Sequence, residues 1–376
     1  MFTTVQIVQK LCPGGIETMA LDFAQYTQAN ERNFIISLDG KKSELLQHWP
    51  RLKNFSDKII CLEKPPGFSL KAILKLKQLL IDLESDCIHT HHIGPLIYGG
   101  TAARLVGISN ILHTEHDAWH LNNKKHRILQ KIALHIAKPT FIADSNLVAD
   151  IAAEKLGNIS PEVIYNGVDT DKFCLGQQAD ARARMQLPQD VKLIGCAGRL
   201  ETVKGQEVLL EAMARLPSFV HVALAGIGSN EQNLRKLCKE LDIEKRVHFL
   251  GLVEDMPSFY QSLDIFCLPS YNEGFPLSPL EAQSCGIPVV LTNTGASFET
   301  LCPDLGEIVK PGDSFGMANA IRKVNLHLST QPNKESDALM HNEFNFASQK
   351  AKTRNFVKEF AAIEQMLNAY QKLKMQ

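Results

Sequence analysis

The chain has 376 residues, of which 44% are hydrophobic and 22% are charged, and its formal net charge is −1. This length accommodates two domains of ordinary size, and the composition is typical of a globular protein and excludes a largely disordered one. A net charge close to zero gives no general case for nucleic-acid binding, so we expect no nucleic-acid partner.

No apolar run approaches the roughly 20 residues of a membrane-spanning helix. The first eight residues lack a basic segment followed by a long apolar one, so we expect no signal peptide. Nine cysteines stand at irregular spacing without a C-x-x-C pair. This pattern is typical of reduced thiols and predicts a cytoplasmic protein.

Strands and helices alternate from the start of the chain. Residues 4–8 predict a buried strand, and residues 12–17 predict a glycine loop that opens a helix. A strand, a glycine turn and a helix in this order form the frame of a loop that approaches phosphate groups. The G-x-G-x-x-G fingerprint of dinucleotide-binding proteins is absent, which disfavours an oxidoreductase.

Further strands are predicted over residues 33–38 and 58–62, and an amphipathic helix over residues 69–84. The next strand ends near residue 91. The strand after it, 110–113, runs into the polar sequence His113-Thr114-Glu115-His116-Asp117. Three interpretations of this sequence remain open: a metal site, although the spacing matches no known ligand pattern, a structural cluster, and an acceptor-side active site.

Residues 140–143, 145–156 and 163–164 complete a β/α series of Rossmann type. Asp144-Ser145 is typical of a helix N-cap. Asn166-Gly167 is a turn signal, and we expect a linker over residues 166–188, where Gly176 and Pro188 interrupt the pattern.

The second half begins with an apolar strand at residues 191–196. Residues 198–205 follow it, with Arg199 and Lys204 at a strand-to-helix turn. Arginine binds phosphate oxygens as a planar fork and lysine adds a mobile charge. Two cations at a helix start are unfavourable for the helix dipole unless an anion lies between them, which favours a diphosphate site.

Two more strands end in glycine turns, at Gly226 and Gly251. The sheet continues with strands over residues 264–268, 288–291 and 307–309. Asp313 is expected to cap a helix that begins near Ser314, and residues 351–374 predict one long helix.

The most informative stretch is residues 270–282, between a strand and a helix. Glu273 lies in the loop at the carboxyl end of a strand, where open α/β sheets bind ligands. Glu281 lies about one turn inside the helix, and its side chain leans towards the helix N-terminus. Because the first N–H groups of a helix attract anions, two hydroxyl-binding acids around this helix start would suit a nucleotide sugar.

These motifs resemble those of retaining glycosyltransferases of family 4. Residues 273–282, E-G-F-P-L-S-P-L-E-A, followed by C-G-I-P-V-V, resemble the E-x₇-E signature of that family. Residues 198–205 resemble its G-R-L-x-x-x-K-G motif, and residues 14–17 its G-G-x-E loop. N-G-V-D at residues 166–169 resembles its interdomain passage.

The resemblance implies an α/β protein with the GT-B fold, in which two Rossmann-like β/α/β domains face a central cleft. We expect residues 1–170 to form the N-terminal acceptor-binding domain and residues 171–350 the C-terminal domain that binds the nucleotide-sugar donor. Residues 351–376 would form a C-terminal helix that crosses back to the N-terminal domain.

The resemblance also implies roles for single residues. The implied catalytic residues are Glu273, His116, Arg199 and Lys204. The implied donor-binding residues are Gly15, Arg199, Lys204, Gly226, Gly251, Phe275, Leu277, Ser278 and Glu281. The family often has glycine where Pro276 stands, and proline has no N–H group, so the phosphate contacts would fall to Leu277 and Ser278.

The expected activity is transfer of a hexosyl group from a UDP- or GDP-type nucleotide sugar to a glycan or lipid-linked acceptor, with retention, in cell-surface polysaccharide or lipopolysaccharide synthesis. No D-x-D-like acidic pair is placed for a divalent cation, so we expect neither a metal nor another cofactor. Two alternatives remain: a nucleotide-sugar epimerase of the same fold, and an inactive nucleotide-sugar-binding protein.

Basic residues gather in the N-terminal half. Residues 41–77 hold nine bases and three acids, an excess of 9 − 3 = +6, and residues 118–143 hold five bases and no acid. Beside apolar residues such as Phe68, Trp119 and Leu121, these bases make an anionic membrane surface a candidate partner. We therefore expect a cytoplasmic protein, with peripheral attachment to the inner face of the cytoplasmic membrane as a hypothesis. Solvated helix faces are the alternative, with Leu70, Ile73, Leu76 and Leu80 packed on the sheet.

Overall fold

The computed structural model describes residues 1–303, 305–324 and 337–375, without the side chains of residues 337–347. Contacts between Cα atoms divide the chain into two compact units, each of α/β type. The first unit consists of residues 1–166 and 365–376, and the second unit consists of residues 167–364. The predicted boundaries were 170/171 and 350/351.

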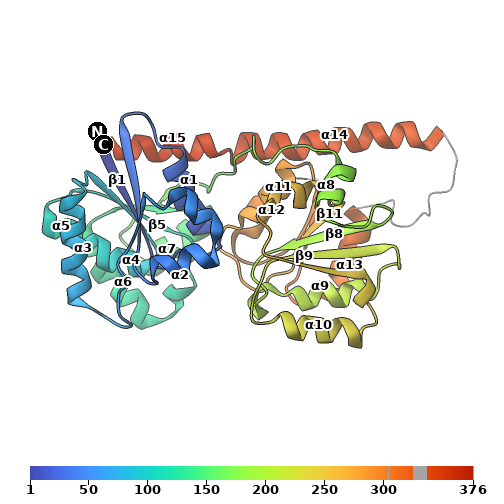
Figure 1. The fold of residues 1–376 in the computed structure, drawn as a ribbon, viewed down its shortest axis with the longest axis horizontal. Coiled ribbons are helices and arrows are strands. Elements are labelled where there is room, and N and C mark those ends of the chain that lie inside the picture. The colour runs from blue at the N-terminus through green and yellow to red at the C-terminus, as the bar shows by residue number, and fades with distance from the viewer. Residues whose placement is uncertain (304, 325–336, 376) are drawn as a thin grey trace. The chain divides into compact units, whose positions relative to one another are not determined.

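The first unit is built on a parallel sheet, in which the described residues form seven strands in the order β3-β2-β1-β4-β5-β6-β7 (Figure 1). The helices α1 and α2 lie on one side of this sheet, and α3 and α5 on the other (Figure 1). The strands are β1 (Phe2–Val8), β2 (Glu31–Ser37), β3 (Ile59–Cys61), β4 (Cys87–His91), β5 (Asn110–Glu115), β6 (Thr140–Ala143) and β7 (Glu162–Val163).

Side-chain caps fix where several helices of this unit begin. Ser69 caps α3 by accepting from the N–H of Ala72, and Ser145 caps α7 by accepting from the N–H of Val148. The helices are α1 (Gly15–Gln25), α2 (Lys42–His48), α3 (Leu70–Asp82), α4 (Ile93–Pro95), α5 (Thr101–Val106), α6 (Lys124–Ala137), α7 (Asn146–Leu156) and α15 (Ile363–Lys374), with shorter turns η1 (Pro50–Phe55), η2 (Leu96–Gly100) and η3 (Trp119–Asn122).

Helix α3 illustrates how the sequence pattern sets the packing. Ile73, Leu76 and Leu80 recur at helical spacing and are buried against the sheet, as expected. Leu70, which was expected to pack with them, is 62% exposed. It is the first residue of the helix and lies next to the Ser69 cap.

The second unit repeats the architecture with a parallel sheet whose described strands have the order β10-β9-β8-β11-β12-β13. Its strands are β8 (Lys192–Ala197), β9 (Val220–Ala225), β10 (Val247–Gly251), β11 (Ile265–Leu268), β12 (Val289–Thr292) and β13 (Gly306–Val309). Its helices are α8 (Gln178–Arg184), α9 (Gln206–Met213), α10 (Glu231–Glu240), α11 (Met256–Gln261), α12 (Leu277–Ser284), α13 (Ser314–Val324) and α14 (Asp337–Phe360), with turns η4 (Thr202–Lys204), η5 (Glu244–Arg246) and η6 (Gly295–Thr300).

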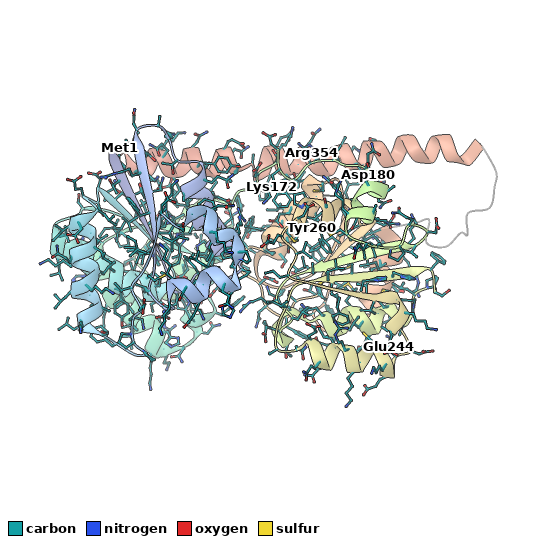
Figure 2. All side chains as sticks on the ribbon, in the orientation of Figure 1. Met1, Lys172, Asp180, Glu244, Tyr260 and Arg354 are labelled. Atoms are coloured by element: carbon teal, nitrogen blue, oxygen red, sulfur yellow. The ribbon has the colours of Figure 1, made fainter. Side chains whose placement is uncertain are left out.

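The central strands of this sheet are buried on both faces, because helices α9, α10 and α13 lie on one side and α8, α11 and α12 on the other (Figure 1). Continuous apolar runs are expected for such strands. Side chains fill the space between the sheet and its helices (Figure 2). As predicted, Asp313 caps α13, since its Oδ1 accepts from the N–H of Gly316 at 2.7 Å.

The segment predicted as a linker contains a packed helix, so that prediction is wrong over residues 178–184. Arg182 on α8 is buried and donates to Asp264 Oδ2 at 2.7 Å and to the carbonyl oxygen of Ser262 at 2.9 Å. Asp264 also accepts from the N–H of Leu193 and from Lys192 Nζ. This ion pair attaches α8 to the sheet, an interaction between residues 82 apart that local sequence does not reveal.

The predicted single helix over residues 351–374 is also wrong, because α14 ends at Phe360 and α15 begins at Ile363. At the break, the N–H of Val168 donates to the carbonyl oxygen of Ala361 at 2.8 Å, and the N–H of Ile363 donates to the carbonyl oxygen of Val168 at 3.0 Å. The backbone groups at the break therefore bond to another segment of the second unit.

Helix α15 completes the first unit from residue 365 onwards. Tyr370 is fully buried, and its hydroxyl lies 2.8 Å from Thr114 Oγ1 on β5. Asn110 donates to the carbonyl oxygen of Lys374, and Gln371 donates to Glu31, both at 2.7 Å. These contacts fix α15 against β2 and β5.

Candidate active site

The sheet of the second unit has its topological switch point between β8 and β11. From β8 the chain proceeds outwards through β9 and β10, whereas β11 leads in the opposite direction to β12 and β13. Ligands of open α/β sheets bind at such points, outside the carboxyl ends of the strands. The loop after β8 carries Arg199 and Lys204, and the loop after β11 carries Ser270 and Glu273.

Lys204 and Glu273 meet at this point. Lys204 Nζ donates to Glu273 Oε1 at 2.7 Å, and Ser270 Oγ donates to the same oxygen at 2.6 Å. The side chains of Lys204 and Glu273 are 22% and 9% exposed, so the pair lies at the edge of the surface. A mobile ammonium and an oriented carboxylate are therefore within reach of one bound molecule.

Glycine allows the two loops to approach this closely. Gly205 has a positive φ of 63°, and a Cβ atom there would lie 2.2 Å from the carbonyl oxygen of Pro269. Gly295 has a φ of 52°, and its Cβ would lie 1.6 Å from the carbonyl oxygen of Glu273. Any side chain at either position would displace the loop that carries the acid.

Glu281 is held by a residue that sequence reasoning missed. Tyr260 on α11 is fully buried and donates its hydroxyl to Glu281 Oε2 at 2.6 Å. Burial and the charge of Glu281 raise the pKa of Tyr260 well above its usual value, so the hydroxyl stays protonated and donates. The contact fixes the direction of the Glu281 carboxylate.

The start of α12 lies between the two acids in sequence. Pro276 is its N-cap, without a side-chain capping bond, and Leu277 is its first helical residue. Pro279, the third helical residue, has no N–H group, so the first turn offers the N–H groups of Leu277 and Ser278. The Phe275 side chain is buried, and its ring lies 6.4 Å from that of Phe360.

Three further glycines lie side by side at the same edge of the sheet. The N–H of Gly198 donates to the carbonyl oxygen of Ala225, and the N–H of Gly226 donates to that of Gly251 at 2.7 Å. These bonds join the loops after β8, β9 and β10. Arg199, which follows Gly198, has an exposed side chain. The second unit thus brings together all the predicted site residues except Gly15 and His116.

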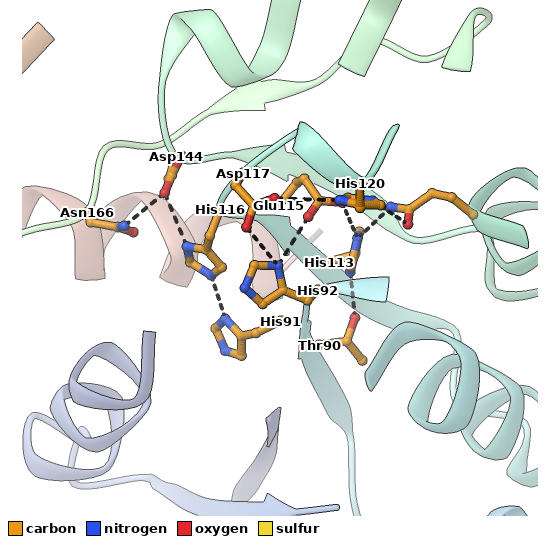
Figure 3. Close-up of polar contacts among 11 residues, drawn as sticks. Thr90, His91, His92, His113, Glu115, His116, Asp117, His120, Asp144 and Asn166 are labelled. Carbon is orange, nitrogen blue, oxygen red and sulfur yellow. Dashed lines mark hydrogen bonds and ion pairs between the residues drawn. The ribbon is translucent and has the colours of Figure 1, made fainter. Parts of the chain in front are cut away.

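Those two residues belong to the first unit, whose switch point lies between β1 and β4. Gly15 is the first residue of α1, after β1, and is exposed. A polar group surrounds the carboxyl ends of β4 and β5 (Figure 3). We call it the histidine cluster: His91, His92, His113, Glu115, His116, Asp117, His120, Gln130, Asp144 and Asn166.

Glu115 is the buried acid of the histidine cluster. Its Oε2 accepts from Gln130 Nε2 at 2.7 Å and lies 3.7 Å from Nε2 of both His113 and His120. Its Oε1 lies 3.4 Å from His92 Nδ1. Burial alone would raise the pKa of Glu115, but the bonds and charges of His113 and His92 outweigh it and hold this pKa well below its usual value.

Of the histidines in the histidine cluster, His92 has the most exposed side chain, with 29% of it accessible. It has a φ of 67° and a ψ of 169°, a backbone conformation that residues other than glycine rarely adopt. Burial by itself lowers the pKa of His92, but the bond to Glu115 and the charges of Glu115 and Asp117 outweigh this effect and raise it. The raised pKa favours the protonated form of His92, which donates to Glu115.

His116 occupies a different position, because both of its ring nitrogens are engaged. Nε2 lies 3.0 Å from His91 Nδ1, and Nδ1 lies 3.2 Å from Asp144 Oδ2. Asn166 Nδ2 donates to the same Asp144 oxygen (Figure 3). His91 Nε2 lies 2.9 Å from Gln6 Oε1. The His116 side chain is 4% exposed.

The positions of the protons in this row of hydrogen bonds can be worked out from Gln6, which stands at one end of the row. Since Gln6 Oε1 can only accept, His91 carries its proton on Nε2 and accepts at Nδ1 from His116. His116 Nδ1 then either accepts from a protonated Asp144 or, in a cationic His116, donates to an ionised Asp144. Burial, together with the charges of Glu115 and Asp117, raises the pKa of Asp144 well above its usual value, and burial lowers that of His116. The pair is accordingly neutral.

Within the described parts of the chain, no three His, Cys, Asp or Glu side chains are grouped so that they could hold a metal ion. None of the described helices is long and apolar enough to span a bilayer. Asp144, expected as a helix N-cap together with Ser145, bonds into the histidine cluster, and Ser145 alone caps α7.

Several residues of these sites could not be assigned from sequence. His91 ends a predicted strand and His92 follows it, and that position was their only signal. Tyr260 and Gln130 come from elements on which no motif marks them, and Asp144 was marked only as part of a helix N-cap. Their partners stand 21, 15 and 28 residues away in sequence, so only the fold brings them together.

Comparison with known proteins identifies both halves of the chain. Residues 13–172 match the family described as Glycosyltransferase Family 4, and residues 177–334 match the family described as Glycosyl transferases group 1. A D-inositol 3-phosphate glycosyltransferase from Corynebacterium jeikeium is 40% identical over 148 residues, which are 35% of this chain and 35% of that protein. The O-antigen biosynthesis glycosyltransferase WclY from Escherichia coli is 29% identical over 177 residues, 46% of this chain and 50% of that protein.

The matched segments thus cover only a third to a half of these relatives. Solved structures match almost throughout. A glycosyltransferase from Rickettsia africae superposes with a TM-score of 0.79 at 21% identity, over 99% of this chain and 97% of the other. HepE from Anabaena, solved in complex with UDP and glucose, superposes with a TM-score of 0.80 at 21% identity, over 99% of both chains. These likenesses confirm the predicted α/β GT-B fold.

Proposed function

The chain belongs to glycosyltransferase family 4, and from this premise we propose that it moves a hexosyl group from a nucleotide diphosphate sugar to a glycan or lipid-linked acceptor, with retention of anomeric configuration. The observation that carries the proposal is the contact of Lys204 with Glu273 across the switch point of the second unit. It joins a phosphate-binding cation to a hydroxyl-binding acid at the place where such sheets bind ligands.

The chemical problem is a leaving diphosphate that gains charge as the glycosidic bond breaks. We assign its stabilisation to Arg199, to Lys204 and to the N–H groups of Leu277 and Ser278, which act as preorganised donors. No metal is part of this proposal. In the absence of ligand, Glu273 balances the charge of Lys204, so the incoming diphosphate competes with this carboxylate for the ammonium.

The two acids have separate tasks in the proposal. Glu281 accepts hydrogen bonds from the ribose hydroxyls, and the bond from Tyr260 fixes its orientation. Glu273 binds hydroxyls of the transferred sugar and stabilises positive character at the anomeric carbon. The backbone can approach the donor closely at three glycines, Gly15, Gly226 and Gly251. The buried ring of Phe275 packs beneath the loop that carries Glu273.

Retention without a covalent nucleophile is consistent with front-face attack. The acceptor oxygen forms a bond to the anomeric carbon while the bond from that carbon to the diphosphate oxygen breaks. The acceptor's proton passes to the leaving diphosphate oxygen, so that charge and atoms balance. The leaving group is then the base, and no protein side chain is needed to take the proton.

His116 is proposed to bond the transferred sugar. Because His91 and Asp144 engage both of its ring nitrogens, this role requires that the donor replace one of these bonds. His91 Nδ1 is the partner most easily given up, since Asp144 is also fixed by Asn166. The donor hydroxyl would then take the place of His91.

UDP is the nucleotide we propose, supported by the fold shared with HepE, which was solved with UDP, with UDP and glucose, and with UDP-glucose. A role in surface polysaccharide or lipopolysaccharide synthesis is supported by the partial match to an O-antigen biosynthesis glycosyltransferase.

Calorimetry with UDP, GDP and their sugar conjugates tests the donor assignment. We expect binding of a UDP sugar, and the absence of binding to every nucleotide tried would refute the assignment. Product analysis with the bound donor alone tests the reaction. A transferase gives at most slow hydrolysis, whereas conversion of the donor into a second nucleotide sugar would identify an epimerase.

A further inference from the structure

Helix α6 of the first unit carries a row of aliphatic side chains on its outer side. Its buried side holds Gln130, Ala133 and Ala137, and Gln130 bonds to Glu115. Four aliphatic side chains on its outer side are between 43% and 59% exposed: Ile128, Leu129, Ile132 and Ile136. Exposed apolar groups that gather on one helix face are typical of interaction sites, whereas single ones are common on any surface.

The four side chains form a continuous stripe, which we call the α6 stripe. At 3.6 residues per turn, they span an arc of about 100° on the helix surface. Trp119, in the turn that leads into α6, is 44% exposed. Leu121, which the sequence grouped with the exposed apolar residues of this region, is buried and belongs to the core.

Bases flank the α6 stripe. Lys124 and Lys131 are exposed and Arg127 is half-buried, and these three follow one edge of the stripe at helical spacing. Lys125 lies near the start of the stripe, and the exposed Lys138 is the C-cap of the helix. Residues 118–143 contain no acid. Within the described residues, none of these basic side chains makes a hydrogen bond or an ion pair.

The other basic segment, residues 41–77, has a different character. Lys42, Lys58 and Lys75 donate to backbone carbonyl oxygens, and Lys64 lies 3.4 Å from Asp39 Oδ1. These ammonium groups fix loops of the first unit. Residues 41–77 also contain three acids, whereas residues 118–143, which include α6, combine exposed aliphatic side chains with five bases and no acid.

We propose that the α6 stripe and its bases dock on an anionic bilayer surface. An apolar arc flanked by lysines and free of acids matches the interface of such a bilayer, where aliphatic groups enter the acyl boundary and ammonium groups meet lipid phosphates. Lysines bury their stems while their charges stay in the headgroup layer. The charge complementarity favours anionic lipid over a second copy of this chain, whose own α6 would present the same positive charge.

Vesicle sedimentation of the full chain tests the proposal. We expect co-sedimentation with phosphatidylcholine vesicles that contain phosphatidylglycerol, weaker binding at raised salt, and no binding to phosphatidylcholine alone. Removal of Lys124 and Lys131 by substitution to Gln should lower the partition coefficient by roughly fivefold per base. The variant Ile132→Gln/Ile136→Gln should lose binding to vesicles.

Matched controls come from the second unit. Lys239→Gln/Lys245→Gln removes the same charge, and Phe315→Gln removes an exposed apolar side chain; both should sediment like the wild type. The proposal is overturned if the wild type binds neither vesicle, or if the charge control loses binding as much as the α6 variant. It is also overturned if Ile132→Gln/Ile136→Gln abolishes a dimer in analytical ultracentrifugation without a change in sedimentation with vesicles. Calorimetry with UDP on the same variants keeps this test separate from that of the donor site.

Discussion

Replacing Lys204 by Met removes the ammonium and keeps most of the apolar stem, so it tests the anion-binding role of this side chain. Nζ lies 2.7 Å from Glu273 Oε1, and the two side chains are 22% and 9% exposed. One lost charge-assisted hydrogen bond to a diphosphate weakens binding by about 1.5–3 kcal/mol, or roughly 10- to 150-fold in Kd. We expect the Kd for UDP to rise by a factor in this range.

The contact with Glu273 allows a competing explanation, in which Lys204 only orients the acid. Glu273→Gln separates the two, because it removes the carboxylate that faces the ammonium. If Lys204 binds diphosphate directly, Lys204→Met weakens UDP binding at least as strongly in the Glu273→Gln background. Glu273→Gln alone should leave UDP binding intact or slightly stronger, since the diphosphate no longer competes with a carboxylate, while turnover falls.

The assay is calorimetric titration of UDP into the wild type, the two single variants and the double variant, as a double-mutant cycle. Lys236→Met is the control, because Lys236 is an exposed base on α10. The reasoning is refuted if Lys204→Met binds UDP within about twofold of the wild type, the usual error of additivity, with an unchanged circular dichroism spectrum. It is also refuted if Lys204→Met no longer lowers the affinity for UDP in the Glu273→Gln background.

Tyr260→Phe should weaken UDP binding by about 1.5–3 kcal/mol, in line with Glu281→Ala, because Glu281 loses its orienting donor; equal titrations of wild type and variant would contradict this. Arg182→Ala should lower the unfolding free energy of the second unit by about 3–5 kcal/mol, since it leaves Asp264 buried without its closest charge partner. Urea unfolding followed by far-ultraviolet circular dichroism measures this decrease. A decrease of less than about 1 kcal/mol would argue against the prediction. His92→Asn removes a group whose folded pKa is raised. That group adds stability which is full below its unfolded pKa of 6.5 and is lost as pH rises through the folded pKa, so the advantage of the wild type should shrink between acidic and alkaline pH. Both tryptophans lie in the first unit, so their fluorescence in urea reports this difference, and a constant difference would refute the assignment. Turnover should persist in excess chelator, and its abolition with recovery on adding Mg²⁺ or Mn²⁺ would disprove a metal-free reaction.

The parts of the fold that were predicted correctly depend on local signals. Alternating strands and helices, the glycine turns and the caps at Ser145 and Asp313 are each contained in a few neighbouring residues. The helix over residues 351–374 failed for the opposite reason. Its break is set by hydrogen bonds to Val168, which is far away in sequence. Helix propensity is a property of the local sequence and therefore does not reveal such a tertiary partner.

The residues of the candidate site could likewise be predicted where a local signal marks them, whereas their contacts could not. Sequence predicted Glu273, Glu281, Arg199 and Lys204 as site residues because their loops stand in strand-to-helix turns. It did not predict that Lys204 contacts Glu273, because the two are 69 residues apart and only the adjacency of β8 and β11 brings them together. For His116, the sequence indicated its position at the end of a strand. Its burial and its two engaged nitrogens result from packing against β4 and from Asp144.

The discontinuity of the first unit has a consequence for synthesis. Residues 167–364 leave the ribosome before the segment 365–376 that completes the first unit. Until then Phe23 and His89 lack Tyr370, whose ring centroid lies 5.1 Å and 4.9 Å from theirs in the finished fold. A nascent first unit therefore exposes core surface while the second unit forms. During this interval, association with other chains competes with folding. A cut or a fusion close to Tyr370 would accordingly harm the half of the protein that is made first.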